Sequence, residues 1–368
     1  MCVLHPDFLS IARWVGAIIE RDQFCHPLIV LKPFPTLDFC ARPNDRAFRG
    51  ISQRFGKGAI FLSIIPSEED STVYSSDPLI RSVKVLDCGR AEQHWEHRNG
   101  SPLPKLWWVF FGRRWVDLPL QAFLIAHRDG LVLFDTGIDP AVQLDRSYIK
   151  QAIGRFLLPR IFRLHLTAED RIDHVLAKSD VLPEEIKTAV ISHLHFDHVG
   201  GIRHVPQADL LVSEEEWSIL AEPHPEQDWI LREHIEIPSA KWQQISFAPT
   251  DDPLFEGFEG IHDVAGDGSM ILLPTPGHTK GSISMLIRQE GWDPILLVAD
   301  LTYEAVLMQK DVVPGVGDGP TLLASFAKVR KLQERLPNLA IVPSHDFAAS
   351  DIVARATELS SEKGGEET

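Results

Sequence analysis

A chain of 368 residues with 44% hydrophobic and 24% charged residues has an ordinary globular composition and is long enough to bury a sizeable core. Its formal net charge of -16 and the lack of any long Lys/Arg run argue against a nucleic-acid partner, because phosphate binding needs a basic face. No apolar stretch is long enough to span a bilayer and the N-terminus lacks the pattern of a signal peptide, so we expect a cytoplasmic protein without a membrane partner.

Residues 1–80 differ in pattern from the remainder of the chain. They contain scattered apolar pieces and a polar stretch, 66–78, that is typical of a linker. We interpret 1–80 as an N-terminal extension of unknown role, with a start codon assigned too far upstream as the alternative, and 81–368 as the main domain. All four cysteines lie at or before Cys88, which indicates neither a disulfide framework nor a cysteine-type zinc site.

The main domain opens with strand patterns. Residues 82–86 are typical of a strand, and 122–127 with 131–134 predict a hairpin that closes at the turn 128–130. The aromatic run 107–112 is typical of a core strand, with the wall of a substrate pocket as the alternative. A loop is expected directly after the second strand of the hairpin.

A helical pattern follows over 145–178, and Pro159 must break or kink it. Its apolar side chains recur on one face, and these are Ile149, Ile153, Phe156 and Leu157. We expect this face to pack in the core, with a wall of the substrate site as the alternative.

The second half of the domain also alternates between strands and helices. Residues 182–187 predict a short helix with Pro183 in its first turn, and 188–192 predict a buried strand. Further strands are predicted at 270–273, 282–287, 295–298 and 340–342. An amphipathic helix is indicated by the spacing of Leu322, Leu323, Phe326, Val329 and Leu332, and a closing helix follows the last strand. Two such halves would each contribute side chains to a shared site.

Four potential metal ligands lie close together after the buried strand, in the sequence His193-Leu-His195-Phe-Asp197-His198. Alternate residues of an extended segment point the same way, so His193 and His195 can face one cation together. Asp197 and His198 follow where the chain turns and can address a second cation. Imidazoles with a carboxylate suit zinc, iron, cobalt or manganese, and zinc is the default for an all-histidine first site.

Three further candidates, His278, Asp300 and His345, each follow a predicted strand. With the cluster they complete the shells of two metal ions. Two cations roughly 3.5–4 Å apart lower the pKa of a shared water and polarise a carbonyl or phosphoryl oxygen, so the expected nucleophile is hydroxide. Gly200 and Gly201, directly behind the cluster, are expected to let the backbone turn tightly.

The order His-x-His-x-Asp-His, then His, Asp and His, resembles the metallo-β-lactamase superfamily over about residues 81–350. The resemblance implies an α/β (α+β) fold, a four-layer αββα sandwich that follows the N-terminal extension. It also implies a ligand set in which the first metal is held by His193, His195 and His278, the second by Asp197, His198 and His345, and Asp300 bridges the two. Asp135, in Leu131-Val-Leu-Phe-Asp135-Thr-Gly137, matches another superfamily motif and is assigned to orienting the ligands, with a turn-forming aspartate as the alternative.

Within the superfamily, residues 192–201 and the tyrosine three positions after Asp300 resemble the N-acyl homoserine lactonases. The aspartate at position 300, where many classical β-lactamases have a cysteine, disfavours that group of enzymes. The resemblance implies that a metal-bridging hydroxide opens the ester of a lactone ring, with Tyr303 donating to the oxyanion and Asp197 protonating the leaving alkoxide. It implies two divalent metal ions as cofactors and a small lactone or ester as substrate, and it is compatible with a homodimer.

Two alternatives stay open. A phosphotriesterase, an aryl-ester hydrolase or a thioester hydrolase of the same superfamily would use the same two metals, since a site built for a tetrahedral intermediate also accepts a phosphoryl centre. A diiron redox protein would be a different class, but it would need a flavin module, and no phosphate-binding glycine fingerprint occurs in residues 1–80.

Overall fold

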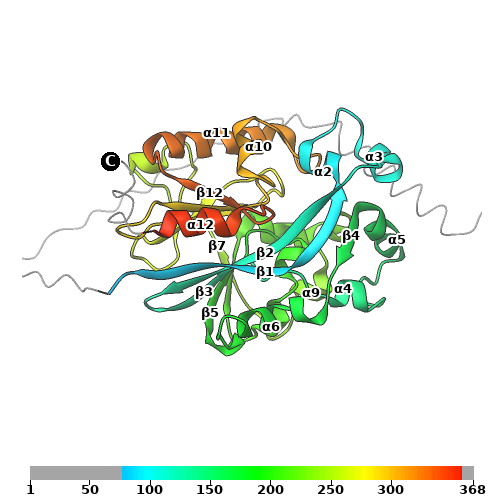
Figure 1. Ribbon diagram of the computed structural model, residues 1–368, viewed down its shortest axis with the longest axis horizontal. Helices are drawn as coiled ribbons and strands as arrows, with labels where there is room; N and C mark the ends of the chain where they lie inside the picture. Colours follow the sequence, from blue (N-terminus) through cyan, green and yellow to red (C-terminus); the bar gives the residue numbers. More distant parts are fainter. Residues whose placement is uncertain (1–76, 359–368) are drawn as a thin grey trace, which may run out of the picture. The chain divides into compact units, whose positions relative to one another are not determined.

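The computed structural model describes residues 77–358. The strands of this region form one seven-stranded and one five-stranded sheet (Figure 1). The first sheet has the spatial order β4 (Phe162–His165), β1 (Ile80–His94), β2 (Trp115–His127), β3 (Gly130–Phe134), β5 (Ile186–Val190), β6 (Asp209–Ser213) and β7 (Lys241–Ile245). The second has the order β12 (Ala340–Pro343), β11 (Ile295–Ala299), β10 (Ile283–Ile287), β9 (Met270–Pro274) and β8 (His262–Asp263).

The alternation of side chains along each strand places the sheets between layers of core. In β3, Val132 and Phe134 join the cluster between the two sheets, while Leu133 joins the cluster on the outer face. In β10, Met285 faces the other sheet and Leu286 faces outward. Both faces of each sheet are therefore covered, as a buried, largely apolar strand requires.

Helices cover the two outer faces (Figure 1). α6 packs on the seven-stranded sheet and α11 packs on the five-stranded sheet. The predicted four-layer αββα sandwich is confirmed. The α-helices of the described region are α2 (Trp95–Asn99), α3 (Lys105–Phe111), α4 (Ala141–Leu144), α5 (Ala152–Ile161), α6 (Ile172–Ala177), α7 (Phe196–Val199), α8 (Glu214–Trp217), α9 (Arg232–Ile235), α10 (Ala305–Gln309), α11 (Gly319–Arg335) and α12 (Ala349–Thr357).

The predicted helical stretch 145–178 is wrong as one element. α5 ends two residues after Pro159, and the chain then forms β4, which pairs with β1. Tertiary pairing with the edge of the sheet has overridden the local helical pattern. The proposed apolar face is wrong in two residues, because Phe156 is exposed and Ile149, although buried, lies before α5 begins. Leu157 is buried as predicted.

The aromatic run 107–112 is helical rather than a strand. α3 begins after Pro104 and ends before Gly112, residues that suit the two ends of a helix. Trp108 and Val109 are buried, but the aromatic side chains on either side of them point to solvent. A short continuous apolar run does not distinguish a buried strand from a helix by its periodicity, which explains the error.

The amphipathic helix in the second half is confirmed as α11. Leu322, Phe326, Val329 and Leu332 are fully buried against the five-stranded sheet, and only Leu323 departs from the prediction, being exposed. In the part of the chain that the structure describes, no helix has the length and apolar character needed to cross a bilayer.

The two sheets present their strand ends at a common place. β3 and β5 run parallel, and so do β11 and β12, while β9 is separated from β11 by the antiparallel β10. The carboxyl ends of all five flanking strands, β3, β5, β9, β11 and β12, therefore lie at matching edges of their sheets. Loops at such edges carry the functional residues of many α/β proteins.

Candidate metal centre

Every predicted ligand follows one of these strand ends. The segment from His193 to His198 lies between β5 and the end of α7, His278 follows β9, Asp300 follows β11 directly, and His345 follows β12. All seven ligand candidates are buried or nearly so. The fold thus brings together residues that lie up to 152 positions apart, from His193 to His345.

Three imidazoles converge at the first position. Nε2 of His193 lies 3.1 Å from Nδ1 of His195, and Nε2 of His278 lies 3.0 Å from that same Nδ1. One ligand atom from each ring falls within 4.8 Å of the others. A hydrogen bond between two imidazoles needs one nitrogen that carries a proton and one that does not, so three nitrogens that face one point cannot all pair with one another. Their arrangement suits a shared cation better.

A carboxylate joins two imidazoles at the second position. Oδ2 of Asp197 lies 3.9 Å from Nε2 of His198 and 3.8 Å from Nε2 of His345. These three atoms also fall within 4.8 Å of one another. The Nδ1 atom of His345 donates to the backbone oxygen of Pro119 at 2.7 Å, which leaves its Nε2 free to act as a ligand.

Asp300 lies between the two positions and shares its carboxylate between them. Its Oδ2 is 3.3 Å from Nε2 of His278, on the first side. Its Oδ1 is 3.2 Å from Nε2 of His198 and 3.1 Å from Nε2 of His345, on the second side. The carboxylate is therefore placed as a bridge between two cations would be.

The two positions differ in electrostatics. At the first, burial lowers the pKa values of His195 and His278 to about 3, so both imidazoles are neutral and ready to bind a metal. At the second, burial also opposes charge on His198, but the carboxylates of Asp300, Asp135 and Asp197 outweigh it and raise its pKa well above 6.5. The second position thus attracts positive charge, which a divalent cation supplies in place of a proton.

The side chains at the two positions are chemically suited to metal ions. Nε2 of His198 and Oδ1 of Asp300 are buried 3.2 Å apart, yet neither atom has a hydrogen bond of acceptable geometry to any described residue, which is costly for polar atoms unless an ion satisfies them. Histidine with aspartate is also a ligand chemistry that zinc and the related transition metals prefer. The residues present therefore fit two divalent cations.

Asp135 does not belong to the group of ligand atoms but holds it in place. Its Oδ2 accepts from Nδ1 of His198 at 2.8 Å and from Oγ of Ser192 at 2.8 Å, and its Oδ1 accepts from the Ser192 backbone at 2.7 Å. The bond to His198 fixes the tautomer that turns Nε2 toward Asp300. Asp135 has a φ of 62°, a conformation that aspartate and asparagine tolerate better than most residues.

Glu216 is a positioning residue that the sequence did not reveal. It is fully buried and accepts from the backbone N–H of Leu194 at 2.9 Å, from Oγ1 of Thr279 at 2.6 Å and from the N–H of Gly281 at 3.1 Å. It thereby ties the loop of His193 and His195 to the loop of His278. A run of three glutamates, Glu214-Glu215-Glu216, is typical of a solvent-exposed segment, and no signal in the sequence indicates that Glu216 is buried.

Gly200 and Gly201 follow the histidine cluster, but the reason that these positions need glycine differs from the predicted one. Gly200 and Gly201 have helix-like backbone angles that any residue can adopt. A Cβ on Gly200 would lie 2.2 Å from the backbone nitrogen of Asp139, and one on Gly201 would lie 2.3 Å from the backbone oxygen of Thr136. The pair is needed for close approach of two backbones and not for the turn itself.

Tyr303 lies beside the second position. Its ring stacks on that of His345, with centroids 5.5 Å apart. Burial, reinforced by the carboxylates of Asp300 and Asp197, raises the pKa of the phenol well above 10, so it stays protonated and can donate a hydrogen bond. His97 from α2, another residue that the sequence did not single out, lies edge-on to Tyr303 with centroids 5.7 Å apart. Its buried Nδ1 has no hydrogen-bond partner among residues 77–358.

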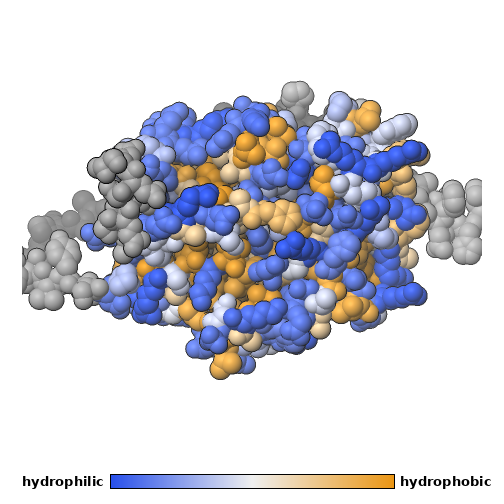
Figure 2. All heavy atoms as spheres, viewed as in Figure 1, coloured by the Kyte–Doolittle hydropathy of each residue, from blue (hydrophilic) through white to orange (hydrophobic). Residues whose placement is uncertain are grey.

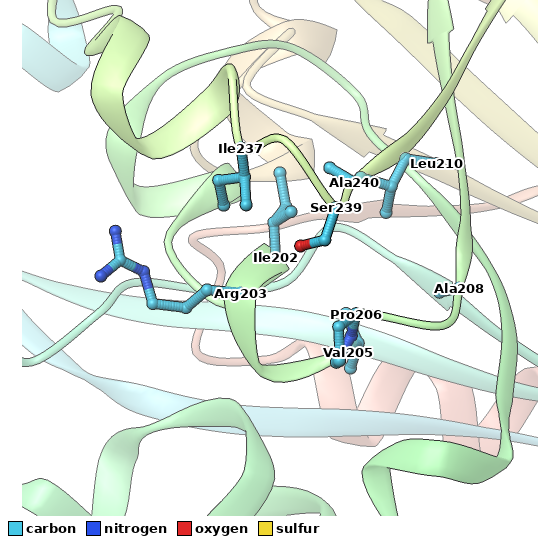
Figure 3. Close-up of a pocket in the computed structure, with 9 residues that line it drawn as sticks. All are labelled: Ile202, Arg203, Val205, Pro206, Ala208, Leu210, Ile237, Ser239 and Ala240. Carbon is cyan, nitrogen blue, oxygen red and sulfur yellow. The ribbon is translucent and has the colours of Figure 1, made fainter.

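A separate cavity of about 200 Å³ lies away from this site (Figure 3). Its lining includes Ile202, Leu210, Ile237, Ser239 and the stem of Arg203. Neither Tyr303 nor any of the seven predicted ligands contributes to it. We therefore assign it no part in the chemistry below.

Comparison with known proteins gives the family. The model of the metallo-beta-lactamase superfamily matches residues 116–345, which span more than half of the chain and run from β2 to the last predicted ligand. The chain belongs to the metallo-beta-lactamase superfamily. The predicted family is confirmed on this match.

Several curated relatives of this chain are named N-acyl homoserine lactonases. The chain is 28% identical to the N-acyl homoserine lactonase AttM of Rhizobium johnstonii over 248 residues, which are 66% of this chain and 87% of that protein. It is 29% identical to an N-acyl homoserine lactonase of a Bacillus species over 218 residues, which are 59% of this chain and 77% of the relative. The predicted resemblance to the N-acyl homoserine lactonases and the class of metal-dependent hydrolase are confirmed.

Solved structures agree on the fold. A structure of an N-acyl homoserine lactone hydrolase with the product N-hexanoyl-L-homoserine at its catalytic metal centre matches with a TM-score of 0.58 and 22% identity, over 74% of this chain and 96% of that one. A Bacillus thuringiensis AiiA variant with bound N-decanoyl-L-homoserine matches with a TM-score of 0.58 and 21% identity, over the same shares. At this identity the likeness establishes the metallo-beta-lactamase fold.

Proposed function

We propose that this chain hydrolyses the ring ester of N-acyl homoserine lactones or related lactones at a site for two divalent metal ions. The observation that carries the proposal is the convergence of seven metal-ligand side chains with a buried, protonated tyrosine. The similarity to curated lactonases supports the choice of substrate class. The individual roles given below to the side chains are part of the proposal.

His193, His195 and His278 would hold the first metal, Asp197, His198 and His345 the second, and Asp300 would bridge them. When bound, two such cations lower the pKa of a shared water toward neutrality and polarise a substrate carbonyl, which is the chemistry that the predicted attack by hydroxide needs. Zinc suits this ligand set best, and iron, cobalt and manganese are the alternatives. Asp135 and Glu216 would keep the ligands in register.

Tyr303 and Asp197 would supply the remaining steps. The protonated phenol of Tyr303 can donate a hydrogen bond to the oxyanion that forms when the carbonyl carbon becomes tetrahedral. Asp197 has 13% of its side chain exposed, against 5% for Asp300, so it is the carboxylate with better access to solvent protons. It would therefore take up a proton from solvent, pass it to the alkoxide that leaves as the ring opens, and return to its ionised form.

A substrate panel tests this proposal. The metal-loaded protein would be assayed on a short-chain and a long-chain N-acyl homoserine lactone, beside a paraoxon-type phosphotriester, an aryl ester and a thioester. We expect the lactones to have the highest kcat/KM. A higher value for the phosphotriester or the thioester would contradict the proposal and favour the corresponding hydrolase of the same superfamily, and redox activity with a flavin partner would favour the diiron alternative.

We further propose residues 1–80 as an extension and 81–368 as the hydrolase domain. β1 begins at Ile80, next to this boundary, but the role of the extension concerns residues outside the described range. A cytoplasmic location and a homodimer also remain predictions. Gel filtration with light scattering would test the second of these.

A further inference from the structure

Two segments of this acidic chain contain no acidic residue at all. The chain has 52 Asp and Glu against 36 Lys and Arg, yet neither 97–116 nor 146–168 includes a single Asp or Glu. Both segments are rich in cations, which are Arg98, Lys105, Arg113, Arg114, Arg146, Lys150, Arg155, Arg160 and Arg163. Charge of one sign is thus concentrated in two separate stretches of sequence.

The fold brings these two stretches together. α3 of the first contacts α5 of the second, and both lie at the same end of the molecule (Figure 1). Nε2 of His94, at the end of β1, pairs with the backbone oxygen of Arg160 at 2.7 Å. The guanidinium of Arg163 lies 4.0 Å from the centroid of the Trp115 ring. The two segments therefore form one continuous surface.

Apolar side chains are exposed on this same surface. Among the described residues, four of the five exposed large aromatic side chains belong to it. We call the surface the aromatic–arginine face, and its exposed apolar members are Leu103, Trp107, Phe110, Phe111 and Phe156. Phe111 is 64% exposed and its ring lies 4.9 Å from that of Trp107. Figure 2 shows hydrophobic and strongly hydrophilic residues side by side at this end.

Burial of the other side of α3 makes this exposure a property of the fold. Trp108 and Val109 anchor the helix in the protein, and Trp108 packs edge-on against His94 with centroids 5.6 Å apart. The exposed aromatic side chains are therefore held outward on a fixed helix. A cluster of this kind, surrounded by cations, is expected to have a binding partner.

We propose that the aromatic–arginine face docks on the surface of an anionic lipid bilayer. Tryptophan and phenylalanine insert favourably at the level of the lipid headgroups, and arginine and lysine stems lie along apolar surface while their charges reach the lipid phosphates. Neither segment contains a carboxylate of its own, and Glu92 and Glu304, which reach these cations, are ion-paired with Arg163 and Arg98, so the face meets less repulsion than the chain as a whole, at -16. Binding is consequently restricted to one orientation.

A membrane-docking face differs from the expectation that the protein has no membrane partner. The sequence-based expectation of no membrane partner considered only segments that span a bilayer, whereas a docked face needs none. The inference does not rest on the proposed lactonase activity, because it uses no residue of the metal centre. Lipid binding and lactone turnover can each fail without the other.

Vesicle flotation with the full-length, metal-loaded protein tests the proposal. The protein would be mixed with vesicles of phosphatidylcholine alone or of phosphatidylcholine and phosphatidylglycerol in equal parts. We expect binding to the anionic vesicles that weakens as salt is added, since each cation near such a surface contributes about fivefold in affinity. Phe110→Ser with Phe111→Ser should lower the affinity by about tenfold or more, because the apolar insertion is lost.

Two comparisons isolate the surface. Arg113→Gln with Lys150→Gln should weaken binding to anionic vesicles without affecting the residual binding to neutral ones. Leu182→Ser with Leu323→Ser, which changes two exposed apolar residues outside the face, should leave binding unchanged. Thermal unfolding and metal content would verify that each variant is folded.

Three results would overturn the proposal. The first is no binding of the wild-type protein to anionic vesicles. The second is binding that survives the change of Phe110 and Phe111. The third is self-association that depends on Phe110 and Phe111, or binding of a single-stranded oligonucleotide, without any binding to vesicles, which would assign the face to a second copy or to a nucleic acid.

Discussion

Oδ2 of Asp135 accepts a hydrogen bond from Nδ1 of His198 at 2.8 Å, and both side chains are almost completely buried. The contact links a residue outside the ligand group to the orientation of a proposed ligand. Because the neutral imidazole has one donor and one acceptor nitrogen, the carboxylate decides which nitrogen faces the metal position.

Asp135→Asn should therefore weaken metal binding without unfolding the protein. Asparagine tolerates the positive φ of this position, but its amide group would face the N–H of His198. We expect metal affinity to fall by about 10- to 100-fold, measured by competition with a chelator. Asp145→Asn, at an exposed aspartate, is the matched control and should keep the wild-type affinity. Equal affinities for the two variants would refute the positioning role.

Tyr303→Phe should lower kcat and leave KM nearly unchanged. The change removes only the hydroxyl that is proposed to stabilise the oxyanion, and a lost donor of this kind costs roughly 100-fold or more in kcat. Tyr148→Phe offers a control, since Tyr148 is also buried but stacks on His234, and it should stay within about twofold of wild type. A kcat of Tyr303→Phe that matches the control would assign Tyr303 to packing alone.

Glu216 should make stability depend on pH. Burial raises the pKa of this carboxyl to about 7, so folding favours its protonated form. The stabilisation is complete below the ordinary value of 4.5 and is lost as the pH rises through about 7. Denaturant unfolding between about pH 5 and 8 should show this loss in the wild type and a flatter profile in Glu216→Gln, which stays neutral.

Glu216→Ala should lower the free energy of unfolding and the metal affinity more than Glu216→Gln does. Glu216→Ala leaves the N–H groups of Leu194 and Gly281 buried without an acceptor, at about 1–3 kcal/mol each. Metal affinity should fall with it, because the two loops of the first metal position are no longer tied together. If Glu216→Gln were as harmful as Glu216→Ala at about pH 5, the account of a carboxyl that is neutral well below pH 7 would be wrong.

Gly201→Ala should destabilise the fold strongly. The added methyl group would lie 2.3 Å from the backbone oxygen of Thr136, which cannot move without shifting the loop of Asp135. We expect a loss of more than about 2 kcal/mol in the free energy of unfolding. Gly319→Ala is the matched control, since its nearest contact would be 3.6 Å away, and it should be neutral or slightly stabilising. A smaller loss for Gly201→Ala than for the control would contradict the close-approach argument.

The positions of the ligand candidates could be predicted because each follows an apolar strand, where polar residues are conspicuous. His278, Asp300 and His345 stand at such ends, and the topology brings the ends together. Glu216 could not be predicted, since burial of only the third residue in a run of three glutamates is decided by tertiary packing. For the same reason, the run at 107–112 gave no sign of which aromatic rings would face solvent.

Metal content measured together with lactone turnover tests the central claim most directly, in wild type and in His195→Ala. The account predicts about two divalent metals per chain and lactone hydrolysis in the wild type, with both metal content and turnover reduced by the substitution. A wild-type protein that binds no metal under metal-replete conditions, or one that hydrolyses lactones equally well after His195→Ala, would contradict it.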